Sequence, residues 1–413
     1  MHDRPDLGRS ALGQVAVDYE RRIDWEALRE LRVSRAREAM RAAGADALLV
    51  FRDENVRFLS GLRPQLIQGK SALLNGCLAR ADGAMTLFLS GGEIDRVRLT
   101  MPWIADARPI PIMQARGLIR GAYETAIAPA IRERGLDRAR IGIDEIAYAQ
   151  VEELARALPG VTLSDGDAPM QSARMVKAPA ELAAMQEAST IAEAVTDTAI
   201  RSIRPGVREQ EVVAEAMRTL YRLGGEMPHV ATPFVASGEH MSPPHRFASD
   251  KIIREGDLVF IDIGAMWNGY YSDLGRTVVC GRPSRAQQEI YTAVHAALGA
   301  ARAAMRVGAT NDDVARAAVA EGAARGFGDR FLSLFIGHGV GMGANEPPYI
   351  GESMDGAETI ELQRGMTMAI EPLIWVDGVS GGGGVRLEDT IAVGEQEGTS
   401  LTRTAFDERL LLE

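Results

Sequence analysis

The sequence feature that most constrains this chain is a pair of carboxylates set inside apolar sequence, within residues 261–277. Asp262 lies in the run LVFIDIG, and Asp273 follows after ten intervening residues in YYSDLGRTVV. Both runs are typical of buried β-strands, which a short loop would join. A buried ionised carboxylate is costly unless a cation pairs with it. Arg276 is at an odd offset from Asp273 and therefore faces the other side of a regular strand.

These aspartates favour a shared metal ion, although two acids that cap turns or face water would show the same pattern. Three further segments supply ligand groups: His338 in GHGVG, Glu371 in MAIEP and Glu388 in VRLEDTIAV. Singly, they could be a core histidine, a strand-end acid and a surface salt bridge with Arg386, which shares a strand face with Glu388. Together the five residues form an oxygen-rich set with one nitrogen. Such a set suits Mn²⁺, Fe²⁺, Co²⁺ or Zn²⁺ and can hold more than one ion.

The pattern along the chain predicts two domains. Up to residue 169, strand-like runs such as ALLVF and RIGID alternate with stretches of helical spacing, which predicts an α/β domain over residues 1–169. The turn-forming sequence DGDAP at residues 165–169 marks the boundary. Over residues 170–413, helical stretches and acid-bearing strands predict an α+β domain. Its helices would lie outside a curved antiparallel sheet whose inner face carries the acids.

The order Asp, Asp, His, Glu, Glu resembles that of the pita-bread metallopeptidases. This family includes Xaa-Pro dipeptidase (prolidase), aminopeptidase P, methionine aminopeptidase and the non-peptidase relative creatinase. The resemblance is strong over residues 170–413 and weaker over the first half of the chain. It implies a creatinase-like N-terminal domain, a pita-bread catalytic domain and two divalent metal ions, Mn²⁺ first, with Co²⁺, Zn²⁺ or Fe²⁺ as alternatives.

The resemblance also implies a place for each ligand: Asp262 chelates one ion, Asp273 and Glu388 bridge both, and His338 and Glu371 hold the second. Two ions held close together polarise a carbonyl and lower the pKa of a bridging water. The hydroxide formed in this way would attack an Xaa-Pro peptide bond at neutral pH. We expect hydrolysis by such a metal-bridging hydroxide.

Two residues are the candidates for catalysis beside the metal. Glu371 is expected to take the proton of the attacking water and pass it to the leaving group. His245, in SPPHRF, is expected to contact substrate and stabilise the developing oxyanion, because aminopeptidase P-like sequences carry a histidine at a comparable spacing before the first ligand. The alternative for His245 is a surface loop histidine. Arg386 is a further candidate for substrate binding.

The remaining histidines have simpler interpretations. His229 follows Pro228, and His240 lies in SGEHMS, so both are expected in loops near the mouth of the site. His295 lies in the helical stretch EIYTAVHAAL and is expected to be structural.

The chain departs from its peptidase relatives at three positions. Asn345 stands seven residues after His338, where prolidase-like relatives usually carry a second histidine, and Leu334 replaces another histidine. Trp375 replaces a tyrosine common after the Glu-Pro pair. The amide of Asn345 can bind substrate through a hydrogen bond but cannot carry a positive charge. We therefore expect Xaa-Pro dipeptides to be poor substrates.

The departures leave a second function open. It keeps the fold but acts on a small non-peptide molecule, through creatinase-like C–N hydrolysis or the C–S cleavage of a dimethylsulfoniopropionate lyase. A third class, a binding module without catalysis, is disfavoured because all five ligands are present.

Composition limits the partners of the 413-residue chain. A net charge of −11 argues against nucleic acid and anionic membranes as partners. Two distant cysteines require no disulfide framework, which agrees with a reducing cytoplasm. We find neither a signal-peptide pattern nor an apolar run of about 18 residues. The expectation is a cytoplasmic enzyme for a small peptide or small molecule, assembled as a homodimer as its relatives often are.

Overall fold

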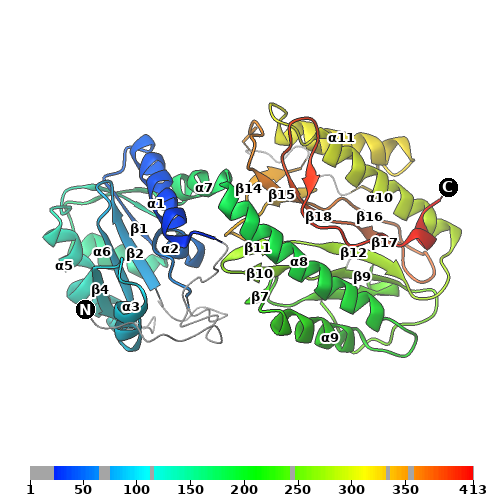
Figure 1. Ribbon diagram of the computed structural model, residues 1–413, viewed down its shortest axis with the longest axis horizontal. Coiled ribbons are helices and arrows are strands. Elements are labelled where there is room, and N and C mark those ends of the chain that lie inside the picture. Colours follow the sequence, from blue (N-terminus) through cyan, green and yellow to red (C-terminus); the bar gives the residue numbers. More distant parts are fainter. Residues whose placement is uncertain are drawn as a thin grey trace. The chain divides into compact units, whose positions relative to one another are not determined.

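The computed structural model describes residues 23–64, 75–111, 116–241, 247–331, 335–351 and 358–412 (Figure 1). The chain divides into two compact units, Met1–Arg174 and Met175–Glu413. This division falls a few residues after the boundary predicted from the sequence.

The first unit is built on a mixed six-stranded sheet in the order β4-β3-β2-β1-β5-β6. Its strands are β1 (Ala47–Val50), β2 (Asn75–Arg80), β3 (Met85–Ser90), β4 (Asp106–Ile110), β5 (Arg140–Ile143) and β6 (Thr162–Asp165). Its helices are α1 (Trp25–Ala42), α2 (Asp53–Ser60), α3 (Ile94–Thr100), α4 (Arg116–Ala122), α5 (Ala128–Glu133), α6 (Tyr148–Ala157) and α7 (Asp167–Met175). Strand β1 pairs antiparallel with β2 and parallel with β5, and Leu49 of β1 packs in one core with residues of α4, α5 and α6.

The second unit contains antiparallel sheets and four long helices. The helices are α8 (Pro179–Ser202), α9 (Glu209–Arg222), α10 (Arg285–Ala304) and α11 (Asn311–Ala324). The first group of strands is β7 (Met227–Pro228), β8 (Phe234–Ser237), β9 (Leu258–Asp262), β10 (Ala265–Trp267), β11 (Tyr270–Ser272) and β12 (Gly275–Val279). The second group is β13 (Gly337–Gly339), β14 (Glu346–Ile350), β15 (Thr367–Ile370), β16 (Leu373–Trp375), β17 (Gly384–Arg386), β18 (Asp389–Ala392) and β19 (Thr399–Ser400).

The two pairs of helices cover different groups of strands. Helices α8 and α9 share a core with β8, β9 and β12, whereas α10 and α11 share a core with β15, β17 and β18 (Figure 1). Along β9, Val259 and Ile261 belong to the core of α8 and α9. Because side chains alternate along a strand, Phe260 and Asp262 point to the opposite face, away from α8 and α9. The apolar pattern of β9 thus fixes the direction of its acid.

The segment between the two aspartates differs from the short loop that the sequence predicted. Strands β9 and β12 do pair directly, with Asp262 opposite Gly275. Between them, however, β10 and β11 form a second hairpin that pairs with β7 in a sheet of its own. Its turn is Asn268-Gly269, with φ of 46° and 84°, and Asn-Gly is the preferred sequence for such a turn. Asp273 consequently lies between β11 and β12.

Candidate metal centre

All five predicted ligands are buried, and none is more than 3% exposed. They come from five places in the second unit: Asp262 ends β9, Asp273 precedes β12, His338 is central in β13, Glu371 follows β15, and Glu388 lies between β17 and β18. This burial excludes the alternative in which the two aspartates face water.

Backbone pairing brings these residues together from distant parts of the chain. The Glu388 amide donates to the Gly275 carbonyl at 2.9 Å, and Gly275 pairs with Asp262. The Asp273 amide donates to Thr390 Oγ1 at 2.9 Å, and that hydroxyl donates back to the Asp273 carbonyl at 2.8 Å. These bonds join the start of β12 and the residues before it to the start of β18. As a result, carboxylates from both groups of strands face one another.

The remaining pair of ligands is set by β13 and β15, which run antiparallel. His338 Nε2 lies 3.4 Å from Glu371 Oε1 and 3.5 Å from Asp273 Oδ2. His338 Nδ1 is 3.0 Å from the Gly339 carbonyl, so it can donate its proton there. That bond selects the tautomer in which Nε2 presents a lone pair to the carboxylates, as in metal-binding histidines.

The carboxylates leave several oxygens without a hydrogen-bond partner among the described residues. These are buried atoms: Asp262 Oδ1, Asp273 Oδ1 and both carboxylate oxygens of Glu388. Burying a charged acceptor without a partner is strongly unfavourable. The ligand atoms of two sets each lie within 4.8 Å of one another, namely Asp262 with Asp273 and Glu388, and His338 with Glu371 and Glu388. Two neighbouring divalent cations fit these residues.

Arg386 supplies a guanidinium to three of the carboxylates. Its Nη2 lies 2.8 Å from Glu371 Oε2 and 3.5 Å from Glu388 Oε2, and it also pairs with Asp262. This charge does not balance four acids. Burial raises the pKa of Asp262 and of Glu388 well above their usual ranges, because neighbouring carboxylates repel and Arg386 compensates only in part.

Positive neighbours act more strongly on the other two acids. Burial raises the pKa of Asp273, but His229 and His338 outweigh it and lower that pKa to about 2. Burial also raises the pKa of Glu371, but Arg386 and His338 outweigh burial and lower that pKa. For His338, burial lowers the pKa, yet Asp273 and Glu371 raise it to about 10. The Nε2 position therefore attracts positive charge.

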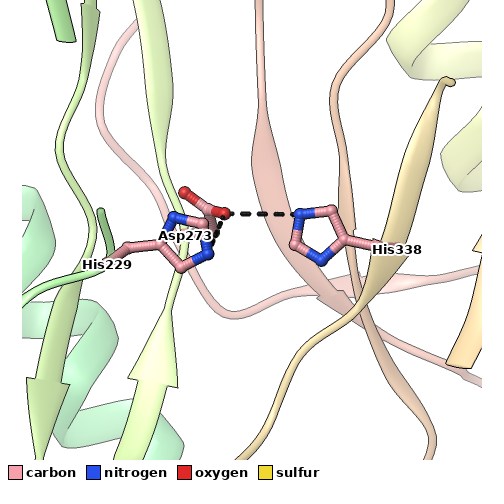
Figure 2. Close-up of side chains that lie close together, drawn as sticks. All are labelled: His229, Asp273 and His338. Atoms are coloured by element: carbon pink, nitrogen blue, oxygen red, sulfur yellow. Dashed lines mark ion pairs between the residues drawn. The ribbon is translucent and has the colours of Figure 1, made fainter. Parts of the chain in front are cut away.

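His229 joins this cluster, although the sequence assigned it a loop role. It follows β7, is buried, and its Nε2 lies 3.0 Å from Asp273 Oδ2. In Figure 2, dashed lines join one carboxylate oxygen of Asp273 to a ring nitrogen of His229 and to a ring nitrogen of His338. The two imidazole rings are nearly parallel, at 8°, and their centroids lie 5.9 Å apart. The sequence spacing between His229 and the aspartates does not predict this contact with Asp273, because the contact depends on how β7 pairs with β10.

The other predicted residues lie in different surroundings. His245 and Leu334 fall outside the described residues, so their roles stay predictions. Asn345 is exposed and immediately precedes β14. His240 Nδ1 lies 3.5 Å from Glu209 Oε1. His295, on α10, packs edge-on against Phe406 at 4.6 Å, which agrees with the structural role expected for it.

Comparison with known proteins identifies the family. A model described as "Metallopeptidase family M24" matches residues 183–395, about half of the chain. The chain is 30% identical over 376 residues to an Xaa-Pro dipeptidase of Pyrococcus horikoshii, which covers 90% of this chain and 97% of that protein. The chain belongs to metallopeptidase family M24. A model of the creatinase/prolidase N-terminal domain matches residues 32–176.

Other relatives of this M24 chain carry related names. An Xaa-Pro dipeptidase of Pyrococcus furiosus is 37% identical over 268 residues, 64% of this chain and 74% of that protein. The crystal structure of the prolidase from Pyrococcus horikoshii superimposes with a TM-score of 0.75 at 28% identity, over 91% of this chain and 99% of that one. The prolidase from Pyrococcus furiosus gives a TM-score of 0.73 at 27% identity, over 89% and 99%. These matches confirm the predicted two-domain pita-bread architecture. None of the helices in the described parts of the chain is both long and apolar enough to cross a membrane.

Proposed function

We propose that this chain is a metal-dependent Xaa-Pro dipeptidase with two divalent ions, Mn²⁺ being the first expectation. The observation that carries the proposal is the buried cluster of four carboxylates and His338, in which several oxygens have no hydrogen-bond partner among the described residues and could bind cations. It lies in a chain similar over 90% of its length to an Xaa-Pro dipeptidase. When bound, the ions would supply Lewis-acid catalysis, polarising the scissile carbonyl and acidifying a water.

The residues of the chain take the following roles in this proposal. Asp262, Asp273, His338, Glu371 and Glu388 hold the ions. Glu371 also accepts the proton of the attacking water and returns it to the departing proline nitrogen. Its two oxygens contact His338 and Arg386, and both contacts keep the carboxylate ionised and fixed in direction.

Substrate binding is assigned to three further residues. His245 and Asn345 would contact the dipeptide, as predicted from the sequence. Arg386 contacts carboxylates in the structure, and its part in substrate binding would follow from orienting Glu371. A homodimeric assembly and a cytoplasmic location also belong to the proposal.

The function is tested with purified protein reconstituted with Mn²⁺. We expect hydrolysis of Ala-Pro and Leu-Pro in preference to Ala-Ala, and loss of all activity after chelation. Creatine and dimethylsulfoniopropionate serve as probes for the alternative small-molecule chemistry. Turnover of either compound without turnover of an Xaa-Pro dipeptide would overturn the proposal.

Glu371→Gln separates proton transfer from metal binding. The amide keeps an oxygen for the ion but cannot accept a proton, so turnover should fall by ~10²-fold or more while part of the metal remains. The measurement is kcat on Ala-Pro together with metal content by mass spectrometry. Glu408→Gln, at an exposed position, is the matched control and should leave both unchanged. Full turnover of Glu371→Gln would remove the proton-transfer role.

Asn345→His tests the departure from the peptidase relatives. Loss of one oxyanion contact typically costs about 10²–10³ in rate, so restoring an imidazole should raise kcat/KM for Ala-Pro by about tenfold or more from a weak baseline. Asn345→Ala, which lacks any donor, should lower it. A wild-type kcat/KM of about 10⁴ M⁻¹s⁻¹ or above would show that the amide suffices and that dipeptides are not poor substrates.

A further inference from the structure

His229 lies against the candidate metal centre, although the five-ligand pattern does not include it. Its Nε2 and His338 Nε2 lie 3.0 Å and 3.5 Å from the same oxygen, Asp273 Oδ2. The ligand atoms of these three residues are all within 4.8 Å of one another (Figure 2). Neighbouring ligands bound at ~2.0–2.2 Å from one ion lie roughly 3.0–3.5 Å apart. The distances from both imidazoles to Asp273 Oδ2 match the spacing of ligands around a single ion.

We propose that His229 is a sixth protein ligand, so that one metal position carries two imidazoles and the Asp273 carboxylate. The inference rests on the metal centre of the proposed function. It adds a residue that the order Asp, Asp, His, Glu, Glu leaves out.

The fold holds His229 in place beside the strand that carries Asp262. The His229 amide donates to the Gly264 carbonyl at 3.3 Å, next to the pairing of Pro228 with Ala265. A Cβ atom on Gly264 would lie 2.6 Å from the His229 Cβ, closer than side chains approach. The glycine two residues after Asp262 therefore permits His229 to approach, and its ring also meets Tyr271 edge-on at 87°.

A positioning role is the competing explanation for the same contacts. In that role, the Nε2 proton of His229 would be shared between Asp273 and the Ala344 carbonyl, which is 3.2 Å away. That distance is at the long end of ordinary N–H···O bonds, so the carbonyl holds Nε2 only weakly. Asp273 Oδ1 also remains without a hydrogen-bond partner among the described residues. Coordination through Nε2 would satisfy its lone pair and could use both carboxylate oxygens, whereas a hydrogen bond satisfies one carboxylate oxygen. His229 Nδ1 has no hydrogen-bond partner among the described residues in either role.

A second imidazole changes which metal this position prefers. Carboxylates suit Mn²⁺, whereas imidazoles suit Zn²⁺ and Fe²⁺. The five predicted ligands alone are oxygen-rich and favour Mn²⁺. With His229, the position beside His338 would have two nitrogen ligands instead of one, while the position beside Asp262 would keep carboxylates alone. We therefore expect the two positions to differ in metal preference, and Zn²⁺ to bind more tightly at the former.

The test counts imidazole ligands directly. Pulsed electron paramagnetic resonance on Mn²⁺-loaded full-length protein should detect nitrogen couplings from two imidazoles in wild type and from one in His229→Ala. In competition with a chromophoric chelator, Zn²⁺ affinity should fall by about 10- to 100-fold or more in the variant, whereas Mn²⁺ affinity should fall less. His295→Ala, which removes a histidine packed against Phe406, is the control and should behave as wild type.

Each outcome decides the inference. A single imidazole coupling in wild type overturns the inference, and this measurement does not depend on whether any variant folds. Unchanged Zn²⁺ affinity in a folded His229→Ala overturns it as well, even if turnover falls, because His229 would then be a positioning residue. Either result leaves the peptidase proposal standing. A wild-type protein that binds no divalent ion overturns the proposed function together with the inference.

Discussion

Asp273→Ala should remove bound metal and peptidase activity together, with kcat/KM for Ala-Pro falling by at least about 10³-fold. Removing an outer-sphere partner of a metal ligand typically lowers affinity or activity by about 10- to 100-fold, and removing a carboxylate that would itself hold the ions should lower it more. Asp273 is the residue that the Thr390 hydroxyl fixes and that both His229 and His338 contact.

The measurement combines kcat/KM with metal content per chain. Asp262→Ala and Glu388→Ala should give the same result, because each removes a buried carboxylate from the cluster. Asp329→Ala is the control, since that aspartate is exposed and 3.7 Å from Arg330 on the surface. An Asp273→Ala variant that keeps full activity and two ions per chain would contradict the five-ligand assignment.

Lys177→Met should lower the free energy of unfolding by about 3–5 kcal/mol, because it removes the ammonium group that pairs with the buried Glu346 carboxylate. Lys177 Nζ lies 2.8 Å from Glu346 Oε1, and both side chains are 2% exposed. The lysine also donates to the Met175 carbonyl at 3.2 Å, and Glu346 accepts from the Gly343 amide at 3.2 Å. The pair thereby ties the start of β14, next to Asn345, to the segment that precedes α8.

Urea denaturation of chelator-treated protein measures this effect without a contribution from metal binding. Adding Glu346→Gln to Lys177→Met should recover much of the loss, because the buried charge is removed with its partner, and the double-mutant cycle gives the coupling energy. Arg201→Met is the control, since its pair with Asp197 is exposed and should contribute less than about 1 kcal/mol. A loss as small as that of Arg201→Met would show that the buried pair does not hold this region together.

The sequence by itself determined which acids are buried within apolar runs. Asp262, Glu371 and Glu388 are charged residues in runs that otherwise read as buried, and burying a charge has so high a free-energy cost that few explanations remain. The alternation along β9 also determined which way Asp262 points, because a strand places successive side chains on opposite faces. The fold class could be predicted from the sequence as well, because the periodicity of apolar residues is a local property of the chain.

The short-range sequence pattern also predicted that Arg276 does not pair with Asp273. Its odd offset predicted the opposite face, and in the structure its Nη2 lies 2.8 Å from Asp389 Oδ1 and its Nε donates to the Thr404 carbonyl at 3.1 Å. The hairpin between the two aspartates was equally accessible, because Asn268-Gly269 is a strong turn signal, but a single loop was predicted instead.

Only the tertiary structure decided the position of His229. Nothing in its sequence neighbourhood marks it, because its contact with Asp273 needs the pairing of β7 with β10, the hairpin that returns the chain to Asp273, and the space beside Gly264. Each condition joins residues that are far apart in the chain. Burial of a charge can be read from the residues on either side of it, whereas the partner that shares the burial depends on how separate strands come together.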